Sequence, residues 1–279
     1  MISIVINSDT RAGFMEQVST QGKMFEGTRS LDYLTYGVRN KREFFKNYDV
    51  ELTLFIDLHE RLPQETETEL LNMLHNGEIQ NLVFNNHCEY LHDSEYFPKF
   101  NDINYINALA LARGEYIVHF DNDMAAFLGD ENVIKEWFQM LDDGKYDYIS
   151  YPSAHSPLPI YDPSFDYVWA STRFFITKNF DYSEVKKCLQ DNEYLYSKYG
   201  DRQRKCPWTE HILGLTAKKG VFYPPLDLNR CMVFSWSNYI SGTYEKMNQL
   251  NYNQKKSLVQ TLGGINYPCD VRMREVTIK

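Results

Sequence analysis

The sequence predicts an α/β fold with a mostly parallel central sheet and helices on both faces. Short apolar runs that suit buried strands alternate along the first half of the chain with longer amphipathic stretches that suit helices. Three of the helix-like stretches end at a glycine, at Gly77, Gly114 and Gly144. Strand–helix alternation with short connections is typical of βαβ units, in which neighbouring strands run parallel.

The expected elements follow one another without a clear linker. Strands are expected at 2–6, 52–56, 79–84, 116–120, 146–151, 169–177 and 221–223, and helices at 31–48, 63–77, 102–114, 131–141, 183–199, 210–217 and 244–262. Long loops are expected at 12–30 and at 152–163, which contains four prolines. We therefore expect one domain over residues 1–225 and a C-terminal extension over 226–279 packed on it. The aromatic side chains Tyr223, Phe234, Trp236 and Tyr239 could stack on a ligand there, or pack the extension onto the core.

The amino-acid composition limits which binding partners and which cellular compartment are expected. The 279 residues carry a formal net charge of −9, which argues against a nucleic-acid partner and against broad attraction to anionic membranes. No run is long enough for a transmembrane segment. The five cysteines are odd in number and widely spaced, with no Cys-x-x-Cys pair, so we expect reduced thiols and a cytoplasmic protein.

The stretch Tyr116–Asp123 reads as a buried strand that ends abruptly in acidic residues. Asp121 and Asp123 stand two residues apart where the strand leaves the sheet. In an open α/β sheet, ligands bind outside the carboxyl ends of the strands. Two carboxylates there could hold Mg²⁺ or Mn²⁺, which in turn would hold a diphosphate. Asp-Asn-Asp is equally good turn and helix-capping chemistry, so the motif alone leaves both interpretations open.

Other expected strands also end in polar residues. Asn7, Asp9 and Arg11 follow the first strand, and Asp57 stands at the end of the second. Because parallel strands place their carboxyl ends at one edge, these side chains are expected to face the same crevice as the acid pair. A nucleotide-binding site at this edge is the interpretation that uses them all, although an Asp after a strand can also simply cap a turn.

Several blocks together resemble glycosyltransferases of the GT-A fold, especially the inverting family 2 group. The blocks are the opening strand Ser3–Ile6, the strand end Phe55-Ile56-Asp57, the run from Asn104 through Ala112-Arg113-Gly114-Glu115-Tyr116 to Asp121-Asn122-Asp123, and Trp208–Leu215 followed by Lys219–Pro224. The run from Asn104 to Asp123 is the specific part, and the likeness extends over roughly residues 1–225. It implies a GT-A type fold, with a Rossmann-like nucleotide-binding half.

The resemblance implies a role for each matching residue. Asp57 would accept a hydrogen bond from the base, commonly uracil, and Asn104 would lie on the nucleotide side. Asp121 would face the ribose or the metal, and Asp123 would ligate the cation, Mn²⁺ or Mg²⁺. Glu210 would be the general base that deprotonates the acceptor hydroxyl, although an acid in the first turn of a helix is also favoured by the helix dipole alone.

Two departures from the family pattern bear on the chemistry. His211 stands where the family often has a second acid, so it could be an alternative base or a surface histidine. The chain has no histidine after His211 that could serve as the late metal ligand of some relatives. Phosphate and water would therefore have to complete the coordination of the metal.

The expected function is a metal-dependent, inverting glycosyltransferase of glycan biosynthesis. It would move a sugar from a nucleotide-diphosphate sugar, a UDP-sugar first, to a hydroxyl of a glycan, lipid-linked or protein acceptor. The alternative is a non-catalytic GT-A-like module that binds a nucleotide sugar or glycan, and a nucleotidyltransferase is a third candidate. The chain lacks the motifs of a Ser-His-Asp hydrolase, a P-loop enzyme and a dinucleotide-binding Rossmann protein. A metal cluster of His87, His92 and His119 is disfavoured, because no two of them share a useful helical spacing.

Overall fold

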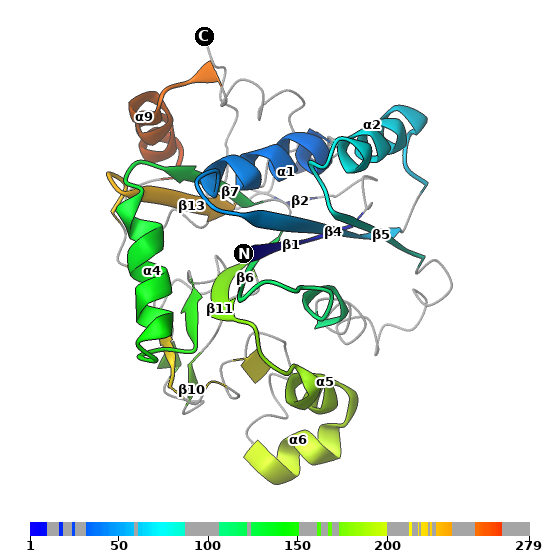
Figure 1. Cartoon of the computed structure of the whole chain (residues 1–279), viewed down its shortest axis with the longest axis vertical. Helices are drawn as coiled ribbons and strands as arrows, with labels where there is room; N and C mark the ends of the chain where they lie inside the picture. The colour runs from blue at the N-terminus through cyan, green and yellow to red at the C-terminus, as the bar shows by residue number, and fades with distance from the viewer. Residues whose placement is uncertain are drawn as a thin grey trace.

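A central sheet of seven strands forms the middle layer of the molecule (Figure 1). The computed structural model describes residues 1–9, 17–18, 24–25, 32–58, 61–86, 106–121, 124–150, 161–162, 167–168, 173–199, 212–213, 217, 219–222, 224, 227–235 and 249–263. Across the sheet the order is β12 (Val221–Phe222), β8 (Tyr148–Ser150), β11 (Phe174–Lys178), β6 (Tyr116–Asp121), β1 (Ile2–Asp9), β4 (Val50–Leu58) and β5 (Asn81–Asn86). The strands expected from the sequence are therefore present, with shifted ends.

The sheet is mostly parallel, as the sequence predicts. β1 pairs in parallel with β4 on one side and β6 on the other, and β4 pairs in parallel with β5. Only β11 runs against its neighbours β6 and β8 within this sheet. The chain thus leaves β1 toward β4 and β5, then returns to the opposite side of β1 as β6. This reversal of direction is a topological switch point, where ligands of open α/β sheets bind.

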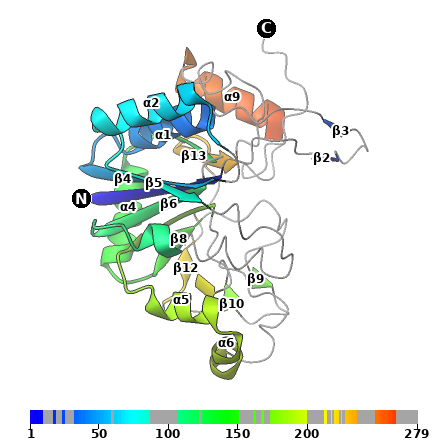
Figure 2. The same cartoon turned by 90° about the vertical axis from the view of Figure 1, so that its right-hand side faces the viewer.

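Helices cover both faces of the sheet, also as predicted. The helices are α1 (Asp32–Phe44), α2 (Gln64–His75), α4 (Asn132–Asp142), α5 (Ser183–Gln190), α6 (Asn192–Tyr199) and α9 (Tyr252–Gly263), with a helical turn at 106–109. Figure 2 shows α1 and α2 on one side of the sheet and α5 and α6 on the other. Alternation along β1 sends Ile4 and Ile6 into the core under α1, α2 and α4, and Val5 into the core under α5 and α6.

Two helix boundaries differ from the sequence expectation. The helix expected over 183–199 is broken at Asp191, whose backbone is extended (φ −131°, ψ 97°). The Asp191 side chain accepts a hydrogen bond from the backbone N–H of Tyr194, so it starts α6. Ser183 does not cap α5; its hydroxyl donates to Asp181 instead. α9 begins only at Tyr252, because Asn251 and Gln254 form a reciprocal capping box there.

Two strands of the structure were not expected from the sequence. β7 (Met124–Leu128) follows the acid pair and pairs antiparallel with β13 (Cys231–Ser235), which belongs to the expected C-terminal extension. Arg230 binds Asp130 and forms a bidentate ion pair with Glu136 of α4, at 2.7 and 2.9 Å. The short pairs β2 (Gln17–Val18) with β3 (Met24–Phe25) and β9 (Tyr161–Asp162) with β10 (Tyr167–Val168) complete the described strands. The domain boundary at residue 225 stays a prediction.

The structure bears on two expectations, reduced cysteines and the absence of a transmembrane segment. Cys188 is a buried free thiol, and burial raises its pKa to about 11, which makes it unreactive. The described part of the chain contains no helix that combines the length and the apolar character needed to cross a bilayer. The cytoplasmic location stays a prediction.

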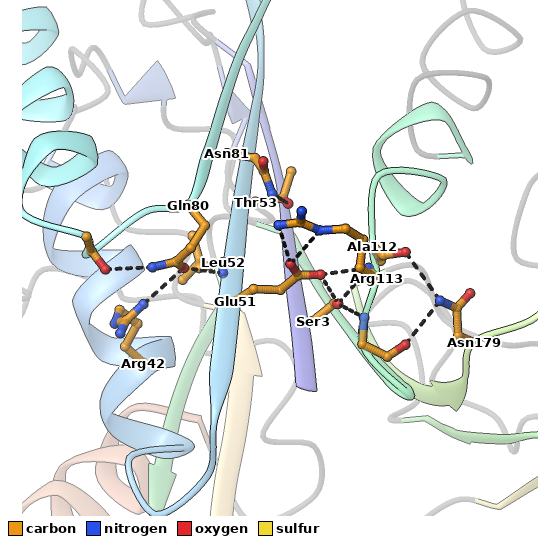
Figure 3. A network of polar contacts seen from close by, with 12 residues as sticks. Ser3, Arg42, Glu51, Leu52, Thr53, Gln80, Asn81, Ala112, Arg113 and Asn179 are labelled. Carbon is orange, nitrogen blue, oxygen red and sulfur yellow. Dashed lines mark hydrogen bonds and ion pairs between the residues drawn. The ribbon is translucent and has the colours of Figure 1, made fainter. Parts of the chain in front are cut away.

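A buried polar network ties β1 and β4 to the turn that precedes β6 (Figure 3). The Glu51 carboxylate accepts hydrogen bonds from the Ser3 hydroxyl (2.5 Å) and from the backbone N–H of Arg113 (2.6 Å), and it pairs with the Arg113 guanidinium. The Ser3 oxygen also accepts from the N–H of Gly114 at 2.6 Å. Asn179 closes the network by donating to the carbonyls of Ala112 and Gly114.

This close approach requires glycine at position 114. A Cβ there would lie 2.6 Å from the Ser3 nitrogen and 2.7 Å from its hydroxyl oxygen. We expect Gly114→Ala to lower the free energy of unfolding by about 1–3 kcal/mol, because the turn cannot move without breaking the network. Urea denaturation measures this. Glu115→Ala, at the exposed neighbouring position, is the control and should change stability by less than about 0.5 kcal/mol; equal effects of the two variants would contradict the explanation.

The network also predicts a pH dependence of stability. Burial alone would raise the pKa of Glu51, but the hydrogen bonds from Ser3 and Arg113 and the Arg113 charge outweigh it, so the pKa lies below its ordinary value of 4.5. A depressed pKa stabilises the fold above the unfolded-state value, and this stabilisation disappears as the pH falls through the folded-state value. We expect Glu51→Gln to cost roughly 1.5–3 kcal/mol at pH 7 and progressively less below pH 4.5. Denaturant titrations at several pH values test this, and a pH-independent difference would contradict it.

Candidate functional site

Polar side chains gather at the carboxyl ends of four neighbouring strands, around the switch point between β1 and β6. The register places Asn7 beside Asp121, and Asp57 between Asp9 and Asn85. Alternation puts the side chains of Asn7, Asp57 and Asp121 on the face of the sheet that carries Val5, Phe55 and Ile117. The sequence expectation that these strand ends meet at one edge is confirmed for these positions.

Asp57 is held in a defined orientation. It is only 7% exposed, and its Oδ1 accepts a hydrogen bond of 2.9 Å from the side-chain amide of Asn85 on β5. A carboxylate buried at the end of a strand and oriented by a neighbouring amide is preorganised to accept hydrogen bonds from a ligand. Asn85 was not among the residues singled out in the sequence, because the strand end at 85–86 precedes a run of polar residues with no motif.

Asn7 is supported by His119, which lies two residues before Asp121. His119 is fully buried on β6, its ring stacks on Phe175 with centroids 5.2 Å apart, and its Nε2 lies 3.0 Å from Oδ1 of Asn7. Because an amide oxygen only accepts hydrogen bonds, Nε2 of His119 carries a hydrogen and donates it to Asn7 in this contact. Sequence reasoning considered His119 only for a histidine metal cluster with His87 and His92, which lie outside the described residues. The sequence feature that could have pointed to His119 is its position in an expected buried strand, two residues before Asp121.

The acid pair spans the turn between two strands. Asp121 is the last residue of β6 and is partly exposed, and β7 starts at Met124. Asp123, in the connection between the two strands, is outside the described residues. The same holds for Arg11, Asn104, Glu210 and His211, and for Asp9 only the backbone, in β1, is described. The side chains of these six residues therefore stay predictions.

The segment that follows Glu210 and His211 can be placed. Ile212 and Leu213 are 1% and 0% exposed, and they pack in the same core cluster as Val5 and Phe55. This cluster lies on the face of the sheet that carries Asp57 and Asp121. The chain therefore brings the neighbourhood of the predicted base to the same face as the strand-end polar groups.

The chemistry of the site suits a hard cation. Its described side chains at the strand ends, Asp121, Asp57, Asn7 and Asn85, offer carboxylate and amide oxygens and no thiolate. Within the described ranges no three acidic, histidine or cysteine residues lie close enough to hold a metal ion by themselves. Mg²⁺ sites that also use substrate phosphates and water need only one or two carboxylates. Asp121 therefore offers an oxygen ligand of the kind that Mg²⁺ or Mn²⁺ bound together with a diphosphate uses, and the metal and the role of Asp123 stay predictions.

Comparisons with known proteins give structural likeness only. No family model matches the chain, and no curated protein matches it. Solved structures that match include the glycosyltransferase GlyE of Streptococcus pneumoniae TIGR4, with 10% identity, coverage of 98% of this chain and 67% of that one, and a TM-score of 0.43. HddC of Yersinia pseudotuberculosis matches with 13% identity, coverage of 88% and 97%, and a TM-score of 0.44. S. aureus TarS 1-349 has 12% identity and a TM-score of 0.35; the match covers 80% of this chain but only 57% of the TarS chain. Because these TM-scores are low, the α/β fold rests on strand order and pairing.

Proposed function

We propose that this chain is a metal-dependent glycosyltransferase that uses a nucleotide-diphosphate sugar. The observation that carries the proposal is the meeting of Asn7, Asp57 and Asp121 at the carboxyl ends of β1, β4 and β6, around the switch point of the sheet. A nucleotide fits such a crevice in open α/β sheets. The acid pair at the same edge would bind a hard cation, and this cation would in turn bind the oxygens of the diphosphate.

The donor would lie across the strand ends. Asp57, oriented by Asn85, would accept from an N–H of the base, and uracil, with its single ring N–H, is the first expectation. Asn7, oriented by His119, would face the ribose or phosphate region beside Asp121. Asp121 and Asp123 would hold the cation. When bound, the cation would stabilise the negative charge that grows on the leaving nucleoside diphosphate.

The acceptor would be activated from the opposite side of the sugar. Glu210 would take the proton of the attacking hydroxyl as a general base, and Ile212 and Leu213 anchor its neighbourhood on the required face of the sheet. A single base and no protein nucleophile imply inversion at the anomeric carbon. His211 is the alternative base, and a chain that binds the donor without using either residue would be a binding module. The acceptor would supply a hydroxyl group, which a glycan, a lipid-linked substrate or a protein could each carry.

The donor site predicts metal-dependent nucleotide binding. UDP or GDP with Mn²⁺ should raise the thermal midpoint of the wild type, because a ligand that binds only the folded state stabilises it by mass action. We expect Asp121→Asn to abolish the shift. Asp49→Asn is the control, since Asp49 is an exposed aspartate that precedes β4 at the edge of the sheet opposite Asp121. No shift with any nucleotide in the wild type would overturn the donor site.

The general base predicts a separation of binding from turnover. Glu210→Gln should keep the nucleotide-dependent thermal shift but lower metal-dependent hydrolysis or transfer by roughly 10²–10⁴-fold. Glu193→Gln is the control, because Glu193 is exposed in the first turn of α6, the kind of position that the sequence predicts for Glu210. Unchanged turnover in Glu210→Gln would move the base to His211, which His211→Gln then tests. Donor binding with no turnover in the wild type would favour the binding module.

A further inference from the structure

Helix α1 is joined by side-chain hydrogen bonds to the strand that leaves the acid pair. The Asn40 amide makes two hydrogen bonds of 2.9 Å with the backbone of Ala126, one to its carbonyl and one from its N–H. The next residue, Lys41, donates through Nζ to the carbonyl of Met124 at 2.5 Å. Met124 directly follows Asp123 in the chain. Two consecutive residues of one helix therefore fix the first three residues of β7.

Lys41 is a fully buried charge. Its side chain is 0% exposed, and its Nζ lies 5.6 Å from the centre of the Phe120 ring, which belongs to the residue just before Asp121. The ammonium thus contacts the chain on both sides of the Asp121–Asp123 turn, at Phe120 before it and at Met124 after it.

Packing alone does not call for a lysine at this position. Lys41 shares its face of α1 with the apolar side chains Leu34, Val38 and Phe45, all in the main core. Burying an ammonium costs free energy, and apolar replacements of buried charges are often neutral or stabilising. A methionine would fill nearly the same space without that cost. The observation therefore points to a role in which the charge and the hydrogen bond matter at the turn itself.

We propose that Asn40 and Lys41 are positioning residues for the Asp121–Asp123 turn. Their hydrogen bonds fix the start of β7, and hence the end of the turn that carries the acids. The Lys41 side chain lies on the α1 side of the sheet, against Phe120, so it would act on the acids through the backbone that carries them. This inference rests on the proposed donor site, because it assigns the two residues to metal and diphosphate binding rather than to the proton transfer.

The test measures metal binding and stability separately, without turnover. Mn²⁺ binding in the presence of UDP or GDP is followed at 25 °C by the electron paramagnetic resonance of free Mn²⁺, and the thermal midpoint is measured without ligand. We expect Lys41→Met to keep or raise the midpoint while it weakens Mn²⁺ affinity about 10-fold or more, as loss of a residue that orients metal ligands does. Leu34→Ala, in the same helix and core, is the control and should lower the midpoint with unchanged Mn²⁺ affinity.

Wild-type Mn²⁺ affinity in Lys41→Met would overturn this inference and leave the proposed function standing. If the wild type itself binds no Mn²⁺ with either nucleotide, the proposed donor site fails instead. Should Lys41→Met not fold, Asn40→Ala takes its place and is compared with Leu34→Ala. Weaker Mn²⁺ binding in Asn40→Ala alone supports the positioning role, and equal affinities in the two variants overturn it.

Discussion

The parallel register of β1 with its two neighbours is the constraint on which the candidate site depends. β1 is the only strand that contacts both the β4 side and the β6 side of the switch point, and its register aligns Asn7 with Asp121 and Asp9 with Asp57. A shift of one residue would turn Asn7 to the other face, toward the core of α1 and α2. The network of Ser3, Glu51 and Gly114 at the opposite edge helps to hold this register, because it joins β1 and β4 to the turn before β6.

The two faces of the central sheet differ in the polarity of their side chains. The face under α1, α2 and α4 is apolar along β4 and β6 and along β1 as far as Ile6, and it supplies most of the core. The other face is apolar only in its middle, at Val5, Phe55 and Ile117, and polar toward both edges. Stability and ligand chemistry are thus separated across the thickness of one sheet. The exception is Lys41, a charge buried on the apolar side, at the point where the chain passes around the strand ends.

Local chemistry explains which features the sequence predicted. Gly77 and Gly144 were expected to end helices, and both have a positive φ, which glycine adopts without strain. Asp57 and Asp121 were found because strand ends and acids are local patterns. β7 was missed because Ala125 and Ala126 resemble a helix as much as a strand, and its partner β13 lies about a hundred residues away. Asn85, His119 and Lys41 owe their importance to tertiary contacts, which no local pattern contains.

The pairing of β7 with β13 also determines when the fold can be completed during synthesis. β7 continues from the acid turn, yet the strand that satisfies its backbone, together with Arg230, leaves the ribosome only after residues up to Ser235 have been made. At roughly 5–20 residues per second, the delay between the two strands is on the order of 5–20 s. During this time β7 exposes an unpaired edge, which is prone to association with other chains. In the folded protein Asn40 and Lys41 of α1 bond the backbone of Ala126 and Met124, and the set of strand contacts is complete only once β13 has been made.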